Sequence, residues 1–259
     1  MSYQTITLVK EAGVVTLTIN RPPLNPLNSQ FFRELDRVVA EIGGDQEVRV
    51  LIITGAGEKA FAAGADVTEM VDLTPLEMYD FCRLSLAAYN RLENLDKPTI
   101  AAVNGLALGG GCELALACDF RLAAETARFA LPEINLGIIP GGGGTQRLPR
   151  LIGTARAREL LFLGEMIDAA TAREYGLVNR VVPGNALLSE AGKLAEKLLA
   201  KPPVAQRMLK MALNNGMNMD LPAALLFELE SFLLAFGSAD RVEGFRALLE
   251  KRKPEFKGK

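Results

Sequence analysis

The chain has 259 residues, of which 49% are hydrophobic, so it can bury the core of one large folded domain. Its 29 basic and 31 acidic residues give a net charge of −2, which argues against the basic surface typical of a nucleic-acid-binding protein. Because the chain has no histidine, Ser-His-Asp and Cys-His nucleophiles and the usual catalytic zinc ligands are excluded, and proton transfer near neutral pH must fall to carboxylates, Lys, Tyr, Cys or water.

The cysteines, Cys82, Cys112 and Cys118, are odd in number and have neither disulfide-framework nor zinc-type spacing. This usage favours a reducing compartment. The N-terminal residues do not read as a signal segment, and no unbroken apolar stretch reaches membrane-spanning length. We therefore expect a cytoplasmic protein with no membrane partner.

The first elements follow from hydrophobic periodicity. Alternating apolar and polar residues predict a strand over Val14–Asn20, which ends at the proline-rich segment RPPLNPLN. A helix is expected from Ser29, as a plausible N-cap, to the glycines at 43 and 44. Val48–Thr54 reads as a strand buried on both faces, which is typical of a parallel sheet covered by helices. The small residues of Phe61–Asp66 follow it as a loop where backbone can approach a ligand closely.

The stretch Pro98–Asp119 reads as a strand, a glycine turn and a helix, and it is preceded by a helical pattern over Leu76–Leu95. Three glycines, Gly109–Gly111, expose backbone N–H groups at the helix start, where they can hold an oxygen that carries negative charge. Glu113 lies in the first turn of that helix. Taken alone, the pattern favours an ordinary tight turn with an N-terminal glutamate.

Further on, Glu133 interrupts the apolar run LPEINLGIIP, either as a solvated loop residue or as a deliberately placed carboxylate. Gly141–Gly144 predicts a second glycine turn into a helix, but no Lys-Ser or Lys-Thr pair follows it as a phosphate-binding loop requires. Beyond Gly153 the patterns are helical. The segment Pro222–Phe236 is too apolar for a one-sided surface helix, which suggests contact with another subunit.

Four motifs in order, AFAAGAD, NGLALGGGCELA, LPEINLGIIPGGGGTQRL and EKRKPEFK, resemble the enoyl-CoA hydratase/isomerase family of the crotonase superfamily over nearly the whole chain. The resemblance implies an α/β fold, a spiral of ββα units. It places this core domain at residues 1–195 and a helical C-terminal region at residues 196–259. That region is expected to assemble the chain into homotrimers, or into homohexamers built as dimers of trimers.

The resemblance also implies the site. The backbone N–H groups of Ala65 and Gly110 match an oxyanion hole for the thioester oxygen, and Glu113 and Glu133 match two glutamates that activate water, with Glu133 delivering the proton to the α carbon. No metal or separate cofactor is implied, because coenzyme A is part of the acyl-CoA substrate. The remaining substrate contacts would be Ala63, Gly64, Asp66, Val67, Gly109, Pro132, Gly141 and, from a neighbouring subunit, Lys251.

The presence of both glutamates favours hydration of trans-2-enoyl-CoA to 3-hydroxyacyl-CoA. The alternatives are an enoyl-CoA isomerase, which needs only one of them, and a hydratase of cyclic dienoyl-CoA. RNA-binding and non-catalytic CoA-binding relatives remain possible outside enzymes. Thr68 stands where hydratases often carry a lysine, so Lys59 and Lys251 are the candidates for meeting the CoA phosphates.

Overall fold

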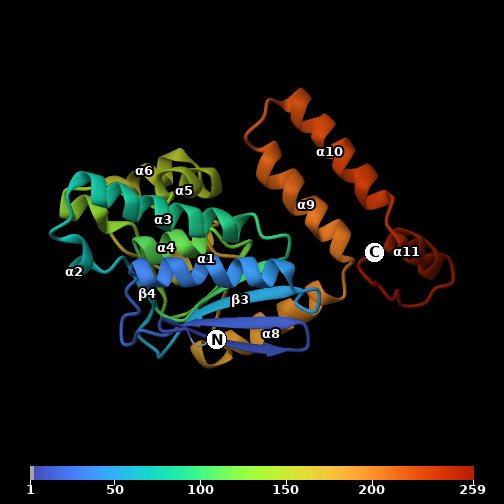
Figure 1. Ribbon diagram of the computed structural model, residues 1–259, viewed down its shortest axis with the longest axis horizontal. Helices are drawn as coiled ribbons and strands as arrows, with labels where there is room; N and C mark the ends of the chain where they lie inside the picture. The colour runs from blue at the N-terminus through green and yellow to red at the C-terminus, as the bar shows by residue number, and fades with distance from the viewer. Residues whose placement is uncertain (1–2) are drawn as a thin grey trace.

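The computed structural model describes residues 3–259, which form two β-sheets with helices around them (Figure 1). The larger sheet has the strand order β1-β2-β3-β5-β7-β10, with all neighbours parallel except β1 and β2. The smaller sheet has the order β4-β6-β8-β9, and only β8 and β9 are antiparallel. The strands are β1 Ile6–Glu11, β2 Val14–Ile19, β3 Val50–Gly55, β4 Ala60–Ala63, β5 Thr99–Val103, β6 Leu106–Leu108, β7 Phe120–Ala124, β8 Arg128–Ala130, β9 Ile167–Asp168 and β10 Arg180–Val182.

Successive strand pairs divide between the two sheets. Of the pairs β3–β4, β5–β6 and β7–β8, the first strand joins the larger sheet and the second joins the smaller one, and a helical segment follows each pair. The expected spiral of ββα units is therefore confirmed. The helices are α1 Ser29–Gly44, α2 Val67–Met70, α3 Pro75–Glu93, α4 Gly110–Leu116, α5 Gly144–Ile152, α6 Thr154–Leu163, α7 Ala169–Glu174, α8 Leu187–Leu199, α9 Pro203–Gly216, α10 Leu221–Phe236 and α11 Ala239–Leu249, with short 3-10 turns η1 Pro132–Leu136 and η2 Gly184–Ala186.

Strand β3 is fully buried, as predicted for a strand covered on both faces. Its residues Leu51 and Ile53 belong to the cluster that includes α1 and α3. Val50 and Ile52 belong instead to the cluster that includes Leu187 and other residues of α8. Helices therefore cover both faces of the larger sheet, which leaves the carboxyl ends of its parallel strands free to carry a site.

Several predicted boundaries were wrong. Asn28, rather than Ser29, is the N-cap of α1, because its backbone is extended and its side chain accepts the Phe31 N–H at 2.9 Å. The segment expected as a loop after β3 begins with strand β4. The glycine turn expected after β5 contains the three-residue strand β6, which is too short to give an alternating pattern. Strands β9 and β10 also lie among the helices predicted beyond Gly153.

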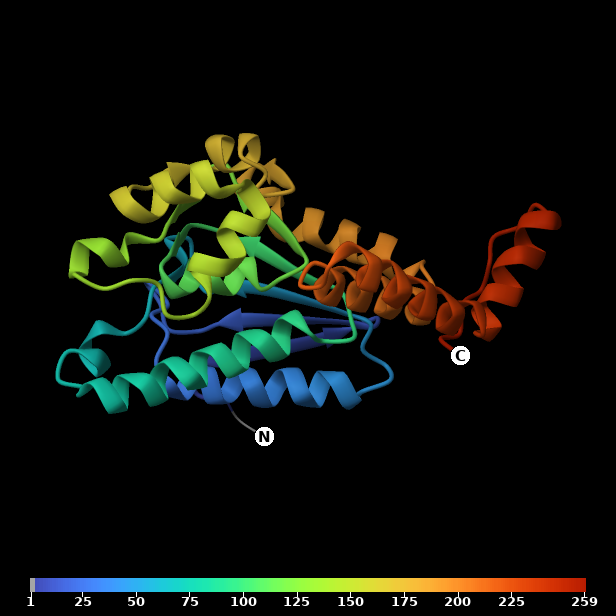
Figure 2. The same ribbon diagram turned by 90° about the horizontal axis from the view of Figure 1, so that it is seen from above.

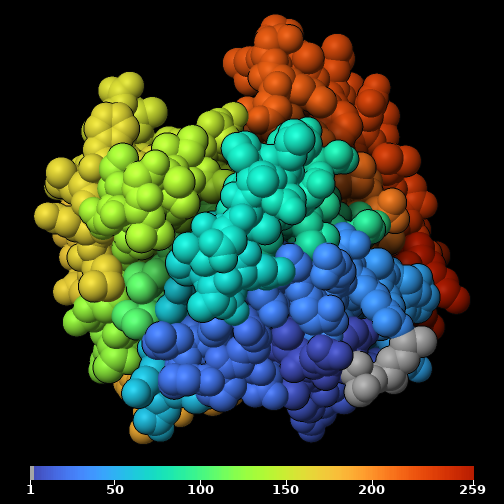
Figure 3. Space-filling model, turned by 60° about the vertical axis from the view of Figure 1, so that its left-hand side comes forward, coloured from blue at the N-terminus to red at the C-terminus, as the bar shows by residue number. Residues whose placement is uncertain are grey.

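Helices α9, α10 and α11 extend away from the two sheets, as both ribbon views show (Figures 1 and 2). We call these three helices the C-terminal arm. Only Ser231 of α10 is buried in the chain, and most of its leucines and phenylalanines are exposed. A cavity of about 670 Å³ lies between α9 of the arm and residues of α3 and α5, and a hollow separates the arm from the α5–α6 segment in the space-filling view (Figure 3). The division of the chain at residue 195 stays a prediction.

No single helix within residues 3–259 meets the length and hydropathy needed to cross a membrane. Helices α10 and α11 meet that criterion only as a pair, and they are bent by 74° relative to each other.

Candidate active site

The start of α4 presents a backbone donor without a protein partner. Gly109 has φ 49°, a left-handed value that glycine adopts without strain, and its N–H donates to the Ala130 carbonyl at 2.9 Å. Gly110 is then the first helical residue, so its N–H has no intrahelical acceptor. Within residues 3–259 it has no acceptor elsewhere either. The Tyr89 hydroxyl donates to the Gly110 carbonyl at 2.8 Å and fixes this peptide.

The end of β4 presents a second such donor. Leu27 pairs with Ala65 in an isolated parallel bridge, through its N–H to Gly64 and its carbonyl to the Asp66 N–H, both at 2.9 Å. In this pattern the N–H of Ala65 itself points away from Leu27, and it has no acceptor in the described part of the chain. A Cβ on Gly110 would stand 3.7 Å from the Ala65 nitrogen. The two predicted oxyanion-hole donors are thus neighbours.

The other predicted contacts after β4 have mixed environments. Ala63 ends β4, and Val67 begins α2 with 55% of its surface exposed. Asp66 caps α2, accepts the Thr68 hydroxyl at 2.6 Å and pairs with Arg21 at 2.9 Å. The Thr68 hydrogen bond and then the Arg21 charge hold the pKa of Asp66 below its usual range. The Asp66 carboxylate is therefore already engaged within the protein.

Glu113 is 3% exposed and is held by the second glycine turn. Its Oε1 accepts the N–H groups of Gly142 and Gly144, each at 2.8 Å. Burial raises the pKa of this carboxyl, while the two hydrogen bonds and the positive charge of Arg147 act in the opposite direction. A Cβ on Gly142 would stand 2.5 Å from Glu113 Oε2, so a side chain there would displace the carboxylate.

Glu133 lies in the short turn η1, directly after Pro132, whose fixed φ suits the first position of a helical turn. Its Oε2 is buried and lacks a hydrogen-bond partner within residues 3–259. Burial, followed by the negative charge of Glu113, raises the pKa of Glu133 to about 7. A Cβ on Gly109 would stand 2.9 Å from Glu133 Oε1, which places this carboxylate beside the Gly110 donor.

These groups form one constellation: two free backbone donors and two carboxylates of unequal surroundings. An unsatisfied buried oxygen is costly, so Glu133 Oε2 has a place for a water or substrate partner. Glu133 exchanges a proton near neutral pH, and the adjacent donors can stabilise charge that develops on a carbonyl oxygen. The site suits acid–base chemistry next to a carbonyl group.

Tyr89, Gly142, Gly144 and Arg147 support this constellation, and sequence reasoning gave them no role in it. The glycine run followed by TQR was the available signal, but Glu113 lies 31 residues before Gly144 and only the fold brings them together. Gly141, a predicted contact, belongs to the same turn, and a Cβ there would stand 3.0 Å from Cys82 Sγ. Lys251 follows α11 on the C-terminal arm, remote from α4 in the ribbon views, so the fold does not bring it to this chain's own site (Figures 1 and 2).

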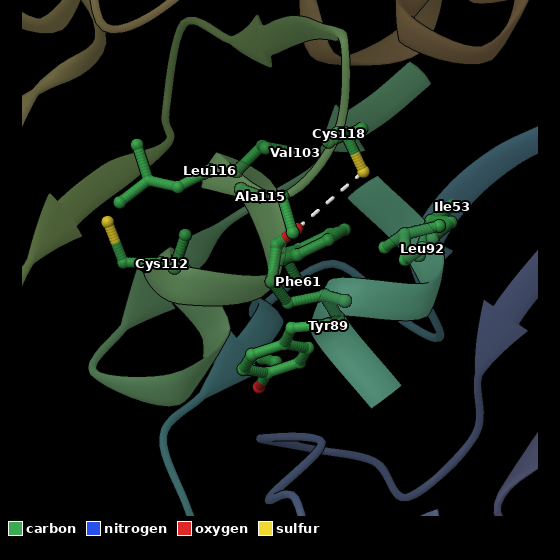
Figure 4. Close-up of a cluster of buried hydrophobic side chains, with 14 of the residues drawn as sticks. Ile53, Phe61, Tyr89, Leu92, Val103, Cys112, Ala115, Leu116 and Cys118 are labelled. Atoms are coloured by element: carbon green, nitrogen blue, oxygen red, sulfur yellow. Dashed lines mark hydrogen bonds between the residues drawn. The ribbon is translucent and has the colours of Figure 1, made fainter. Parts of the chain in front are cut away.

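The cysteines are all free: Cys112 is buried in α4, Cys118 is buried just after it, and Cys82 is half-buried on α3. Figure 4 shows Cys112 and Cys118 on different sides of this helix, with Phe61 and Tyr89 packed beneath it. Burial raises the pKa of the thiols of Cys112 and Cys118. It also raises the pKa of Cys82, which is less deeply buried. None of the three thiols is therefore a candidate reactive group in this site.

Comparison with known proteins identifies the family of the chain. The family model described as enoyl-CoA hydratase/isomerase matches residues 9–259. The chain is 48% identical over 256 residues to the short-chain-enoyl-CoA hydratase of Clostridium acetobutylicum, with 98% of each chain covered. It is 47% identical over 257 residues to the crotonyl-CoA hydratase of Syntrophomonas wolfei, with 99% of each covered.

A crystal structure of enoyl-CoA hydratase from Bacillus anthracis superposes with a TM-score of 0.95 at 44% identity, covering 99% of this chain and 100% of that one. The chain therefore belongs to the enoyl-CoA hydratase/isomerase family, within the crotonase superfamily. The recognition made from the four sequence motifs is confirmed.

Proposed function

We propose that the protein is an enoyl-CoA hydratase that adds water reversibly to trans-2-enoyl-CoA and gives 3-hydroxyacyl-CoA. The observation that carries this proposal is the pairing of Glu113 and Glu133 in one site. A double-bond isomerase needs a single carboxylate to move a proton, whereas hydration needs one group to take a proton from water and another to give a proton to carbon. The relatives named short-chain and crotonyl-CoA hydratase favour a short acyl chain as substrate over a cyclic dienoyl-CoA.

The two carboxylates divide the work in this proposal. Glu113 is the ionised partner that draws the proton from water in this proposal: burial raises its pKa, but the two N–H groups and the Arg147 charge oppose that rise. Glu133, with a pKa of about 7, is the protonated partner that delivers a proton to the α carbon. Water adds at the β carbon, and the pair is left with its proton on Glu113. The proton returns to Glu133 before the next turnover.

The backbone donors of Ala65 and Gly110 would bind the thioester oxygen. Proton transfer at the α carbon builds enolate charge on that oxygen, and a fixed donor aimed at it is typically worth about 3 to 4 kcal/mol in the transition state. The substrate would also contact the backbone at Gly109 and Gly64. The other proposed contacts are Ala63, Asp66, Val67, Pro132, Gly141 and Lys251 of a neighbouring subunit.

Assembly into homotrimers, or into hexamers of two trimers, is part of the proposal. Its support is the C-terminal arm, in which α10 leaves Leu226, Leu233 and Leu234 about 60% exposed, at 64%, 58% and 63%. A single chain rarely leaves so many large apolar side chains of one helix in water, and a second copy of the same arm offers a matching surface. We also propose a cytoplasmic location, which the three free cysteines favour.

The test is an assay of crotonyl-CoA hydration, in which the loss of absorbance of the conjugated thioester measures the rate. Glu113→Gln and Glu133→Gln should each lower kcat by about 100-fold to 10,000-fold, while CoA thioester binding is kept. The double variant should lose little more, because a site that needs both groups fails with the first. Exposed Glu125→Gln is the matched control and should keep the wild-type rate.

Exchange of the α proton with deuterated solvent separates the two roles, and it should fall most in Glu133→Gln. If Glu113→Gln hydrates crotonyl-CoA at the wild-type rate, the two-carboxylate mechanism is wrong and an isomerase with one carboxylate is the better conclusion. If the wild-type protein does not turn over any enoyl-CoA but binds CoA or RNA, the enzyme proposal itself fails.

A further inference from the structure

Arg147 ties the second glycine turn to helix α3. Its side chain is only 12% exposed, and its Nη1 donates to the Gly142 carbonyl at 2.9 Å. Its Nη2 donates to Asn90 Oδ1 at 2.7 Å and to Glu93 Oε2 at 2.6 Å, and its Nε donates to the same Glu93 oxygen at 3.1 Å. The planar fork of a guanidinium holds such partners in a fixed geometry, which a lysine cannot do. The turn is thereby anchored to a long, well-packed helix.

The glycine turn is shaped around this guanidinium. Gly143 has φ 107°, and a Cβ there would stand 2.2 Å from Arg147 Nη1, so the arginine occupies the space that any side chain at this position would need. Gly142 carries a hydrogen bond on each side of its Cα: its N–H reaches Glu113 Oε1 and its carbonyl accepts from Arg147. Fixing the carbonyl of Gly142 therefore helps to fix the direction of its N–H toward Glu113.

Arg147 also has an electrostatic effect on the site. Its positive charge opposes the burial that raises the pKa of Glu113, and it likewise opposes the burial that raises the pKa of Tyr89. The ion pair with Glu93 means that the largely buried guanidinium charge is not left unpaired, which would be strongly destabilising. Glu113 thus receives both hydrogen bonds and favourable charge from one turn of the chain.

On its other side Arg147 borders the 670 Å³ cavity between α9 and α3, together with Asn90, Glu93 and Gly143. The guanidinium is part of the wall between this cavity and the turn that holds Glu113. A shorter side chain would leave the Gly142 carbonyl facing the cavity, where water could replace the arginine and the turn would lose its fixed shape.

We propose that Arg147 is a positioning residue for Glu113: its guanidinium holds the 142–144 backbone so that Gly142 and Gly144 both donate to one carboxylate oxygen. This inference rests on the proposed function only in that Glu113 is taken to be a catalytic carboxylate. Arg147 itself touches no reacting atom and acts through the turn. Glu93 and Asn90 are its supports on α3.

The test compares Arg147→Gln and Arg147→Lys with Arg150→Gln as the matched control. Arg150 lies three residues further along α5 and borders the same cavity, but within residues 3–259 its side chain bonds only to Gln146. Arg147→Gln should lower kcat for crotonyl-CoA by about 10-fold to 100-fold, as is usual for residues that orient a reactive group, with little change in KM. Arg147→Lys keeps the charge without the fork, so its kcat should also fall. Arg150→Gln should match the wild type.

A second readout does not depend on activity. The carboxyl carbon of Glu113, assigned by comparison with Glu113→Gln, can be titrated by NMR in protein labelled at the glutamate carboxyl groups. Its pKa should move upward in Arg147→Gln and much less in Arg147→Lys or Arg150→Gln. If the wild type fails to hydrate crotonyl-CoA but this shift is seen, the hydratase proposal fails and the positioning role stands.

The reverse pattern overturns the inference. Wild-type kcat and an unmoved Glu113 titration in Arg147→Gln would mean that the turn keeps its shape without the arginine. Equal losses of kcat and melting temperature in Arg147→Gln and Arg150→Gln, again with Glu113 unmoved, would assign Arg147 a role in stability alone.

Discussion

Helices α4 and α10 are both rich in apolar residues, yet the fold treats them in opposite ways. In α4 every residue except Gly110 is buried, whereas in α10 only Ser231 is buried. The apolar surface of α4 is used within the chain, where it fixes Glu113 and the Gly110 donor against β4 and α3. α10 packs against α9, but most of its leucines and phenylalanines are left exposed by the single chain. Hydrophobicity along a sequence thus predicts burial, but it does not say which molecule provides the cover.

The largest expected effect comes from removing the donor at the start of α4. Proline at the first position of a helix is compatible with the helix but has no N–H. Gly110→Pro should therefore lower kcat about 100-fold to 1,000-fold, the usual cost of losing one oxyanion donor, while sedimentation stays as in the wild type. Gly110→Ala keeps the N–H and is the control for the added bulk. A folded Gly110→Pro protein with near-normal turnover would remove Gly110 from the site.

Much of this contrast could be predicted from the sequence. The glycines at 109–111, with Glu113 four residues after Gly109, indicated the donor site, and the high apolar content of Pro222–Phe236 indicated an intermolecular face. The hydrogen bonds that position Glu113 could not be predicted, because they join residues far apart in the sequence. Arg147 and Glu93 are 54 residues apart, and Gly142 and Glu113 are 29 residues apart. Such contacts are set by how helices stack on the sheets. Strands of three residues, such as β6, likewise carry no periodic signal.

The second effect concerns α10 and should leave α4 untouched. Leu229 and Leu188 are each 53% exposed, the first on the C-terminal arm and the second on α8 of the core. If copies of the arm cover one another, Leu229→Glu buries an unpaired charge in the contact and should dissociate the assembly at micromolar concentration. Leu188→Glu should not. Analytical ultracentrifugation measures the sedimentation coefficient of both variants. An unchanged coefficient for Leu229→Glu would argue against an interface at this face.

A third effect, in the range of a few-fold per pH unit, sharpens the reading of the α4 site. In the proposed mechanism the active form of the Glu113 and Glu133 pair carries one proton, and the second carboxyl ionises as pH passes the pKa of about 7 of Glu133. kcat/KM for hydration should therefore fall above about pH 7. Hydration takes up no net proton, so its equilibrium constant does not vary with pH. The dehydration rate must then show the same profile, and stopped assays in both directions check it.

The smallest expected effect is on stability. A folded-state pKa of about 7 for Glu133 lies above the value of 4.5 for an unperturbed glutamate, so the folded chain binds more protons between these values and loses stability as pH rises through them. Glu133→Gln removes this loss. Its stability relative to the wild type should be greater at pH 8 than at pH 5 by roughly 1 kcal/mol, a figure reduced for solvent screening. Urea unfolding at the two pH values measures the difference, and an equal difference at both would contradict the raised pKa.

The raised pKa of Glu133 has a consequence for calorimetry, because this chain has no histidine. In most proteins imidazole groups dominate the buffering near pH 7 and hide the protonation of a single carboxyl group. Here no imidazole group competes with the carboxylate pair. The heat of ligand binding, measured in buffers of different ionisation enthalpy, should therefore report proton uptake by the carboxylate pair itself. Calorimetry of the unlabelled protein could thus report the charge state of Glu113 and Glu133 directly.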